Sequence, residues 1–405
     1  MINVIGLGYI GLPTALMLAA HGEIVVGTDY NREVVEKLQN GTVDSEEYGI
    51  KELYDQAKVN IEFSTEYQQT SMYIVAVPTP YNKESKKIDA QYVISAVNSI
   101  MKVCNNDAVI VIESTISPGT IDKFIRPIIN SKNKVCGFKI QIAHAPERII
   151  PGKIIEELKN NSRTIGADDK EVGELVKAKY KSFCQGEIVV TNIKVAEMTK
   201  VVENTYRDVN IAFANELSKI CHKAGINVHE VINIANMHPR VSILQPGPGV
   251  GGHCIAVDPW FLVGDYPQLA KLVYEARTIN DSMPEYVLER LAAIVEEHGI
   301  NDISRVGLYG LTYKENVSDI RESPTLQLLE IMKKHLSIGV KVYDPYCQKQ
   351  VVDNQMFDFE EFVASIDALV VMVAHDEIKK SFKKIKNKII LDTRNIFDGE
   401  NVYKL

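Results

Sequence analysis

The chain has 405 residues, which is too long for one ordinary hydrophobic core and indicates two or three domains. Hydrophobic residues make up 45% of the sequence and charged residues 24%, as in globular proteins, and a formal net charge of −8 argues against nucleic acid or an anionic membrane as partner. The six dispersed cysteines have no metal-ligand spacing and favour a reduced, cytoplasmic compartment, and we see neither a signal peptide nor an apolar run of the roughly 18 residues that a membrane span needs.

The first predicted element is a strand over residues 2–8, which runs into Gly6-Leu-Gly-Tyr-Ile-Gly11. A helix is predicted over 12–20 and a second strand over 23–28, and Asp29 follows directly. Strand, three glycines, helix, strand and acidic residue is the order that a dinucleotide-binding fingerprint requires.

Each residue of this fingerprint has a physical role. Gly6 allows the tight turn, Gly8 lets a pyrophosphate approach the helix N-terminus, and Gly11 lets the helix pack closely on the strand. Asp29 would accept hydrogen bonds from ribose hydroxyls and repel a 2′-phosphate, so we expect NAD rather than NADP. The alternative is a glycine-rich turn that binds nothing.

Strands and helices continue to alternate, with strands predicted over 72–77, 108–112 and 139–143. Polar residues follow the carboxyl ends of these strands, namely Thr79, Thr115, Glu147 and Arg148. Ligands of open α/β sheets bind outside these ends, so we expect the four side chains to face one crevice. For each residue the alternative is a strand-end cap or a solvated charge.

From about residue 191 the pattern changes to long helices. The segment 191–223 lacks Gly and Pro, and Lys200, Asn204 and Arg207 within it are spaced to share one helical face. The alternative is a solvated polar stripe. Further helices are predicted over 227–237, over 259–280 and from there to Gly299.

A glycine-rich loop, residues 247–260, lies between these helices. It carries a single thiol, Cys254, and a carboxylate four positions later, Asp258. Glycine lets a backbone approach a ligand closely, which favours a site built around a nucleophilic thiol. The alternatives are a turn around a buried cysteine and an Asp258-Pro259 pair that merely starts a helix.

The last hundred residues indicate a second doubly wound sheet, with strands predicted over 305–309, 339–343, 368–373 and 388–391. Basic residues near the strand ends suit an anionic nucleotide, and the absence of GxGxxG makes a second dinucleotide less expected. The predicted fold class is therefore α/β, with two Rossmann-like doubly wound domains joined by a central helical domain.

The chain resembles the UDP-glucose/GDP-mannose dehydrogenase family over essentially its whole length. The most specific stretches are Gly6–Pro13, Ala145–Gly152, Ala196–Glu216, His238–Arg240, Gly247–Phe261 and Ile320–Pro324. The resemblance implies an N-terminal NAD-binding domain over 1–190, a central helical domain with the cysteine loop and a dimer interface over 191–299, and a C-terminal UDP-sugar-binding domain over 300–405.

The resemblance also implies a reaction, the four-electron oxidation of a sugar C6 alcohol to a carboxylate by NAD. Cys254 matches the nucleophile, which forms a thiohemiacetal and then a thioester. Lys200 and Asn204 match the pair that stabilises the oxyanion. Asp258 and Thr115 match the pair that positions water, and Glu147 matches the glutamate of the hydrolytic step.

Binding residues follow from the same matches. For NAD they are Gly6, Gly8, Tyr9, Ile10, Gly11, Asp29, Thr79, Thr115 and Arg321. For the UDP-sugar they are Arg148, Ile149, Lys200, Asn204, Arg207, His238, Arg240, Gly251, Tyr313, Lys314 and Arg394. The resemblance implies a homodimer in which Arg240 serves the neighbouring subunit's site.

The chemistry of the residues agrees with this reaction. An aldehyde carbon cannot give up a second hydride as an alcohol does until a nucleophile adds to it, and a thiol supplies an adduct that later hydrolyses. A nearby ammonium such as Lys200 would lower the pKa of that thiol and stabilise the oxyanion.

The sequence departs from the UDP-glucose enzymes of the family at Val257, where those have lysine, and at Pro151, where those have a second glutamate. Both departures favour the N-acetylated-sugar branch, so the expected substrate is UDP-N-acetyl-D-mannosamine (UDP-ManNAc), for bacterial surface polysaccharide synthesis. The alternatives are UDP-N-acetylglucosamine (UDP-GlcNAc) or UDP-glucose as substrate, a two-electron 3-hydroxyacid dehydrogenase, and a non-catalytic NAD and nucleotide sensor.

Overall fold

The computed structural model describes residues 1–44, 47–150, 152–335 and 339–405, so Pro151 lies outside the described residues. The chain divides into two compact units, Met1–Glu203 and Asn204–Leu405. In the described parts of the chain, no helix combines the length and the apolar character that crossing a membrane requires.

The first unit is built on an eight-stranded sheet with the order β3-β2-β1-β4-β5-β6-β7-β8. Its strands are β1 (Ile2–Ile5), β2 (Val25–Thr28), β3 (Ile61–Ser64), β4 (Met72–Val75), β5 (Val109–Ile112), β6 (Gln141–His144), β7 (Arg163–Ala167) and β8 (Ile188–Thr191). Neighbouring strands are parallel except β6 and β7, which are antiparallel. The first six strands in this order form a Rossmann sheet, which confirms the predicted fold of the N-terminal part.

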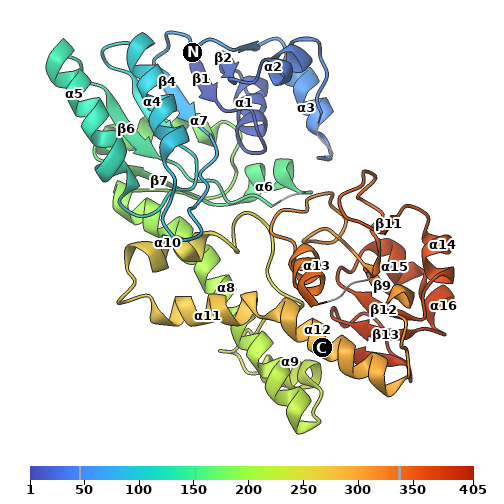
Figure 1. Ribbon diagram of the computed structural model, residues 1–405. Coiled ribbons are helices and arrows are strands. Elements are labelled where there is room, and N and C mark those ends of the chain that lie inside the picture. The colour runs from blue at the N-terminus through green and yellow to red at the C-terminus, as the bar shows by residue number, and fades with distance from the viewer. Residues whose placement is uncertain (45–46, 151, 336–338) are drawn as a thin grey trace. The chain divides into compact units, whose positions relative to one another are not determined.

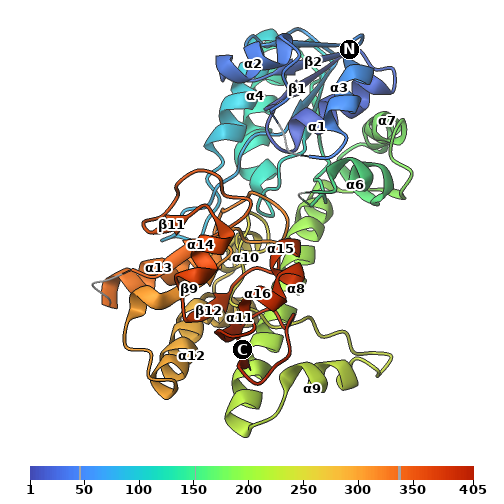
Figure 2. The ribbon, with the colours of Figure 1, turned by 90° about the vertical axis from the view of Figure 1, so that its right-hand side faces the viewer.

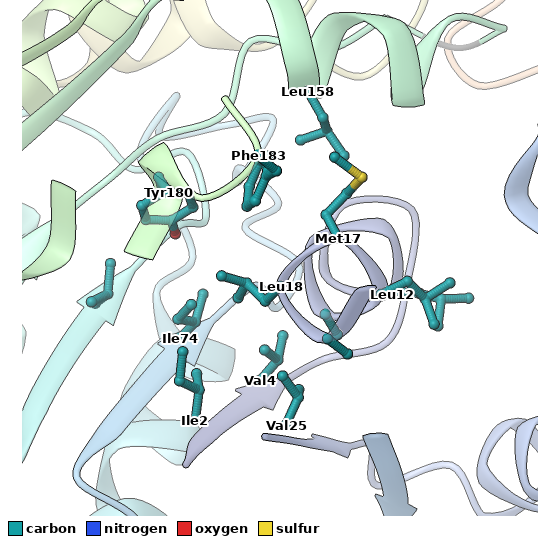
Figure 3. Close-up of a cluster of buried hydrophobic side chains, with 14 of the residues drawn as sticks. Ile2, Val4, Leu12, Met17, Leu18, Val25, Ile74, Leu158, Tyr180 and Phe183 are labelled. Atoms are coloured by element: carbon teal, nitrogen blue, oxygen red, sulfur yellow. The ribbon is translucent and has the colours of Figure 1, made fainter. Parts of the chain in front are cut away.

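Helices cover both faces of this sheet (Figure 1). They are α1 (Gly11–Ala20), α2 (Arg32–Gln39), α3 (Ile50–Ala57), α4 (Gln91–Val103), α5 (Arg126–Cys136) with the π-helical turn η1 (Ile121–Ile125) before it, α6 (Ile154–Asn160) and α7 (Lys170–Lys181). Because successive strand residues point to opposite faces, Val4 packs in a core with α1, whereas Ile5 packs in a second core with α4. Figure 3 shows the first core, where Leu12, Met17 and Leu18 of α1 lie beside side chains of β1, β2 and β4.

A long helix, α8 (Ile193–Ala224), begins in the first unit and continues in the second. Asn192 caps its N-terminus, because the side-chain oxygen of Asn192 accepts a hydrogen bond from the backbone N–H of Val195 at 2.9 Å. The helices that follow are α9 (Val228–Ala235), α10 (Asp258–Asp265), α11 (Lys271–Asp281) and α12 (Met283–Glu297).

The prediction of one helix over 259–280 was wrong, because the segment forms the two helices α10 and α11. Tyr266, which precedes Pro267, has φ −128° and ψ 52°, outside the helical region. Proline disfavours a helical conformation in the residue before it and has no N–H to continue the ladder, so the first helix ends there.

The C-terminal part holds a six-stranded parallel sheet with the order β11-β10-β9-β12-β13-β14. Its strands are β9 (Val306–Tyr309), β10 (Lys341–Tyr343), β11 (Gln355–Met356), β12 (Ala368–Val371), β13 (Ile389–Asp392) and β14 (Val402–Lys404). The helices around it, besides the 3₁₀ turn η2 (Ile303–Arg305), are α13 (Pro324–His335), α14 (Phe359–Ala364), α15 (Asp376–Lys380) and α16 (Phe382–Ile385). One apolar core joins the sheet to α12 and α13, and another joins it to α14, α15 and α16, which confirms a second doubly wound sheet (Figures 1 and 2).

Candidate active site

The turn between β1 and α1 contains two glycines that close packing requires and a third, Gly8, that faces open space. A Cβ on Gly6 would lie 2.6 Å from the carbonyl oxygen of Ala76, and a Cβ on Gly11 would lie 1.8 Å from that of Gly6. A Cβ on Gly8 would have no described atom within 4 Å. Gly8 therefore leaves room at the N-terminus of α1, where backbone N–H groups attract an anion, and this cradle fits the pyrophosphate of NAD.

Asp29 is held beside this turn by the backbone. Its Oδ2 accepts a hydrogen bond from the N–H of Leu7 at 2.8 Å, and its Oδ1 accepts one from the N–H of Asn31 at 2.9 Å. A carboxylate has about four acceptor positions, so capacity for ribose hydroxyls remains. Tyr9 is exposed and donates its hydroxyl to Oε1 of Glu47 at 3.0 Å, and Ile10 is half-buried.

Thr79 and Thr115 lie in the loops that follow β4 and β5, which are paired strands. The hydroxyl of Ser114 donates to the carbonyl oxygen of Val77 at 2.6 Å, and this bond ties the two loops together. Thr79 is buried and Thr115 is half-buried. The two threonines thus follow adjacent strand ends, as expected for a site at this edge of the sheet.

Glu147 and Arg148, which follow β6, are occupied by groups of their own unit. Oε2 of Glu147 pairs with the buried Arg163, and its Oε1 accepts a hydrogen bond from the N–H of Arg148 at 2.7 Å. The guanidinium of Arg148 contacts Oγ1 of Thr164 at 2.9 Å and Oε1 of Glu203 at 2.6 Å. Neither residue is a solvated charge, and a contact of Arg148 with a sugar nucleotide stays a prediction.

Ile149, the next residue, packs against the apolar core that contains α1. Its side chain is thus committed at least partly to the interior. Its predicted contact with the sugar nucleotide also stays a prediction.

Lys200 is a buried cation on α8. Glu197, one turn earlier, fixes the helix to the loop after β5, because its carboxylate accepts hydrogen bonds from the N–H groups of Gly119 at 2.7 Å and Ile121 at 3.0 Å. His144, at the end of β6, interacts electrostatically with Lys200, and its Nδ1 lies 2.8 Å from the carbonyl oxygen of Ile112. Burial, together with the smaller effect of the charge of Lys200, lowers the pKa of His144 to about 4, although the hydrogen bond with Ile112 acts in the opposite direction, so this imidazole is neutral at neutral pH.

In the second unit, Cys254 is an exposed thiol, so the buried-cysteine alternative is wrong. The carbonyl oxygen of Cys254 accepts hydrogen bonds from the N–H groups of Val257 at 3.1 Å and Asp258 at 2.8 Å. These bonds attach the cysteine directly to the start of α10, whose first residue is Asp258. The carboxylate of Asp258 is buried and accepts a hydrogen bond from Nδ2 of Asn204 at 2.6 Å.

The glycine loop before Cys254 is anchored along its length. Oδ1 of Asn215 accepts a hydrogen bond from the N–H of Gly247 at 2.9 Å, and the N–H of Gly252 donates to the carbonyl oxygen of Arg321 at 2.9 Å. A Cβ on Gly251 would lie 2.6 Å from Cβ of Tyr313, so this glycine is required by packing within the protein. Its predicted contact with substrate is not needed to explain it.

The remaining predicted residues of the C-terminal part follow strand ends. Tyr313 and Lys314, after β9, are half-buried, and Arg394, after β13, is exposed. Because β12 pairs with both strands, these side chains belong to one edge of the sheet. Arg321 is exposed and forms an ion pair with Asp319, Nη2 to Oδ2, at 2.6 Å.

The residues predicted on the helical surface separate into two environments. Lys200 and Asn204 are buried, whereas Arg207 on the same predicted face is exposed. His238 and Arg240, beyond α9, are also exposed, and the N–H of Arg240 lies 3.3 Å from Nδ1 of His238. The structure does not join these exposed residues to the Asn204–Asp258 pair through a described hydrogen bond.

Sequence reasoning missed Arg163, the first residue of β7, whose guanidinium pairs with both Glu147 and Glu113. The sequence did contain a signal, an arginine at the start of an apolar strand. Such a cation is rarely buried without a carboxylate partner, so the pattern predicts a buried ion pair.

The comparisons with known proteins cover the whole chain. Residues 1–184, 194–282 and 307–404 match the NAD-binding, central and UDP-binding domains of the UDP-glucose/GDP-mannose dehydrogenase family. A UDP-N-acetyl-D-mannosamine dehydrogenase from Methanococcus vannielii is 44% identical over 100% of this chain and 94% of its own length.

Solved structures of the same family match the chain over its whole length. The UDP-N-acetyl-mannosamine dehydrogenase Cap5O from Staphylococcus aureus is 42% identical, with a TM-score of 0.88 over 100% of this chain and 97% of that one. A UDP-D-ManNAc dehydrogenase from Pyrococcus horikoshii is 36% identical, with a TM-score of 0.91 over 100% of this chain and 99% of that one. NAD is the cofactor, and the chain belongs to the UDP-glucose/GDP-mannose dehydrogenase family.

Proposed function

We propose that the chain oxidises UDP-ManNAc at C6 to the uronic acid. Support for the substrate comes from full-length relatives of that name in Methanococcus, Staphylococcus and Pyrococcus. The observation that carries the chemistry is the exposed thiol of Cys254, attached by its own carbonyl group to the first turn of α10. A thiol that contacts solvent can meet a substrate, whereas a buried one is inert.

The thiol makes a four-electron oxidation possible. The C6 alcohol first loses a hydride and a proton to become an aldehyde, and the sulfur of Cys254 then adds to the aldehyde carbon to give a thiohemiacetal. Loss of a second hydride and a proton leaves a thioester, which water cleaves to the carboxylate and the thiol. NAD, when bound, accepts the hydride in each oxidation.

The other catalytic residues of the proposal act on charge and water. Lys200 and Asn204 would donate to the oxygen on C6 as its negative charge develops. Asp258 and Thr115 would orient water, and Glu147 would take a proton from it during hydrolysis. The hydrogen bond from Asn204 to Asp258 supports a linked role for these two residues.

For binding, we propose that Tyr313, Lys314 and Arg394 hold the UDP group. Their position after the ends of β9 and β13 supports this, because ligands of open α/β sheets bind there. Arg321 would reach NAD, and Arg207, His238 and Arg240 would contact the sugar nucleotide as the family resemblance implies.

We also propose that the chain forms a homodimer. Support comes from three large side chains of α8 spaced seven residues apart, Tyr206, Phe213 and Ile220, which are 65%, 50% and 56% exposed. This spacing makes a narrow apolar stripe of the kind that two copies of a helix bury against each other. We propose, in addition, that the chain has three domains divided at residues 190 and 299. We place it in the cytoplasm, with a role in surface polysaccharide synthesis.

The experiment is a stoichiometry measurement on the purified chain. NAD is supplied with UDP-ManNAc, UDP-GlcNAc or UDP-glucose in separate reactions, and NADH and the acid product are both quantified. We expect two NADH for each UDP-ManNAc consumed. One NADH per sugar would indicate a two-electron dehydrogenase, turnover of UDP-GlcNAc alone would change the substrate, and no turnover with NAD bound would favour the sensor.

A further inference from the structure

The carboxylate of Glu147 is held by a buried cluster that the proposed chemistry does not yet use. Arg163 is 3% exposed, Glu147 5% and Glu113 1%. The guanidinium of Arg163 uses Nη2 for Oε2 of Glu147 and Nη1 for Oε1 of Glu113, at 3.5 Å. One planar cation therefore lies between two carboxylates, an arrangement that arginine supports and that the single ammonium of lysine cannot reproduce.

Aromatic groups fix the position of the cation. The guanidinium carbon of Arg163 lies 4.3 Å from the ring centre of Tyr180 and 5.7 Å from that of Phe183. The hydroxyl of Tyr180 donates to Oε1 of Glu113 at 3.0 Å, so Tyr180 contacts both Arg163 and Glu113. Figure 3 shows Tyr180 and Phe183 beside each other in the core of the first unit.

The two carboxylates of the cluster are held differently. Two carboxylates face one guanidinium, so full ionisation would leave an uncompensated buried negative charge, which is costly. Burial raises the pKa of Glu113, although Arg163 and Tyr180 act in the opposite direction. Glu113 thus favours its protonated form more than a solvated glutamate does, and of the two carboxylates Glu147 forms the closer ion pair with Arg163.

The contacts of Glu147 give it one fixed orientation. Arg163 holds Oε2, and the N–H of Arg148 holds Oε1 at 2.7 Å. We propose that Arg163 is a positioning residue that holds the carboxylate of Glu147 at the end of β6 for the hydrolytic step. This inference rests on the proposed function, in which Glu147 assists the cleavage of the Cys254 thioester.

The step balances without an oxidant. The oxygen of water adds to the thioester carbon as one of its protons passes to Glu147. The carbon–sulfur bond then breaks, and Cys254 leaves as a thiolate. The remaining proton of the new carboxylic acid goes to solvent.

The test separates hydrolysis from the two oxidations. Arg163→Met, Arg163→Lys and Glu147→Gln are mixed with NAD and UDP-ManNAc, and the NADH burst is recorded together with the intact mass of the protein. We expect all three variants to keep the burst of two NADH per site, to lose about 10²-fold in steady-state turnover, and to accumulate an acyl group on Cys254. A role in folding alone would not produce that adduct.

Two controls bracket this result. Glu113→Gln should keep turnover within a few-fold, because it is isosteric with the protonated glutamate and still accepts from Tyr180. Arg126→Met removes another ion-paired arginine of the same unit, one that contacts Asp122 and Asp168, and should leave turnover unchanged.

A slowed first hydride in the Arg163 variants, or an adduct in Glu147→Gln but in neither Arg163 variant, would overturn the inference. If Arg163→Met does not fold, Arg163→Lys decides the question by the same two readings. If the wild-type chain oxidises none of the sugar nucleotides, the proposed function fails, and that result is distinct because it precedes any comparison of variants.

Discussion

Nδ2 of Asn204 donates a hydrogen bond to Oδ2 of Asp258 at 2.6 Å, and both side chains are buried. The bond joins α8 to the first residue of α10, the helix on which the backbone of Cys254 is anchored. A hydrogen bond to a charged group in a buried setting contributes more than an exposed one.

The first prediction concerns the strength of this bond. We expect Asn204→Ala and Asp258→Ala each to lower the free energy of unfolding by about 1.5–3 kcal/mol, because each leaves a buried polar partner unsatisfied. The double variant should lose clearly less than the sum of the two, and urea unfolding of all four proteins measures that coupling. Glu275→Ala, at an exposed carboxylate on α11, is the control and should stay within about 0.5 kcal/mol of wild type. Strictly additive losses would show that the two residues are independent.

The second prediction separates the glycines of the NAD turn. Gly11→Ala places a methyl group 1.8 Å from the carbonyl oxygen of Gly6, so we expect it to lower the free energy of unfolding by about 1–3 kcal/mol. Gly8→Ala meets no described atom within 4 Å, so its stability should stay within about 0.5 kcal/mol of wild type. Its Kd for NAD should nevertheless rise tenfold or more, about 1.4 kcal/mol, because the methyl group occupies the approach to the helix N-terminus. Thermal unfolding and calorimetric titration check the pair, and unchanged NAD affinity in Gly8→Ala would contradict the assignment.

The third prediction concerns the thiol. We expect Cys254→Ser to abolish acid formation while leaving the folded state intact, because a hydroxyl is a far weaker nucleophile than a thiolate. Product analysis measures the acid, and thermal unfolding checks the fold. Cys136→Ser replaces the other exposed cysteine and should turn over like wild type. Acid formation by Cys254→Ser at the wild-type rate would refute covalent catalysis.

Lys200→Ala tests the fourth prediction, that this cation stabilises the oxyanion. We expect kcat to fall by about 10²–10³-fold, the usual effect of removing one such donor, with a smaller change in KM. Steady-state kinetics with UDP-ManNAc measures both constants. A near-normal kcat would remove Lys200 from the mechanism.

The NAD turn could be predicted because its requirements are local. Gly6 adopts a positive φ of 88° in the turn, Gly11 lies against the carbonyl group of Gly6 five positions earlier, and Asp29 follows β2 directly, so spacing alone identifies them. Gly251 shows the opposite case. The resemblance indicated a ligand contact at Gly251, but the atoms that exclude a side chain there belong to Tyr313 and Glu322, more than sixty positions later, and no local pattern reveals them.

Long-range pairing also explains why Arg163 was missed. It reaches Glu147 because β7 runs antiparallel to β6, whereas alternating strands and helices predict parallel neighbours. The exposure of side chains on α8 could not be predicted either. The sequence places Lys200, Asn204 and Arg207 on one helical face, but it does not show that only the first two are buried.

The last prediction concerns pH and His144. Burial lowers the pKa of His144 to about 4 in the folded protein, whereas an exposed histidine has a pKa of about 6.5. Between these pH values the unfolded chain binds more protons than the folded chain, so the contribution of His144 is fully present above about pH 6.5 and is lost as the pH falls toward 4. The total loss from this group is about 3 kcal/mol, at 1.36 kcal/mol per unit of pKa difference.

The variant that isolates this effect is His144→Asn, whose amide can donate to the carbonyl oxygen of Ile112 as Nδ1 of the imidazole does but does not titrate. We expect wild type to be the more stable protein at pH 7.5 and its advantage to shrink by about 2 kcal/mol at pH 5, as measured by urea unfolding. His21→Asn is the matched control, because it replaces an exposed histidine whose Nδ1 lies 2.8 Å from the carbonyl oxygen of Met17. If the free energies of unfolding of wild type and His144→Asn changed with pH in parallel, the imidazole would gain a proton as readily in the folded state as in the unfolded chain. That result would contradict the conclusion that His144 is neutral beside Lys200.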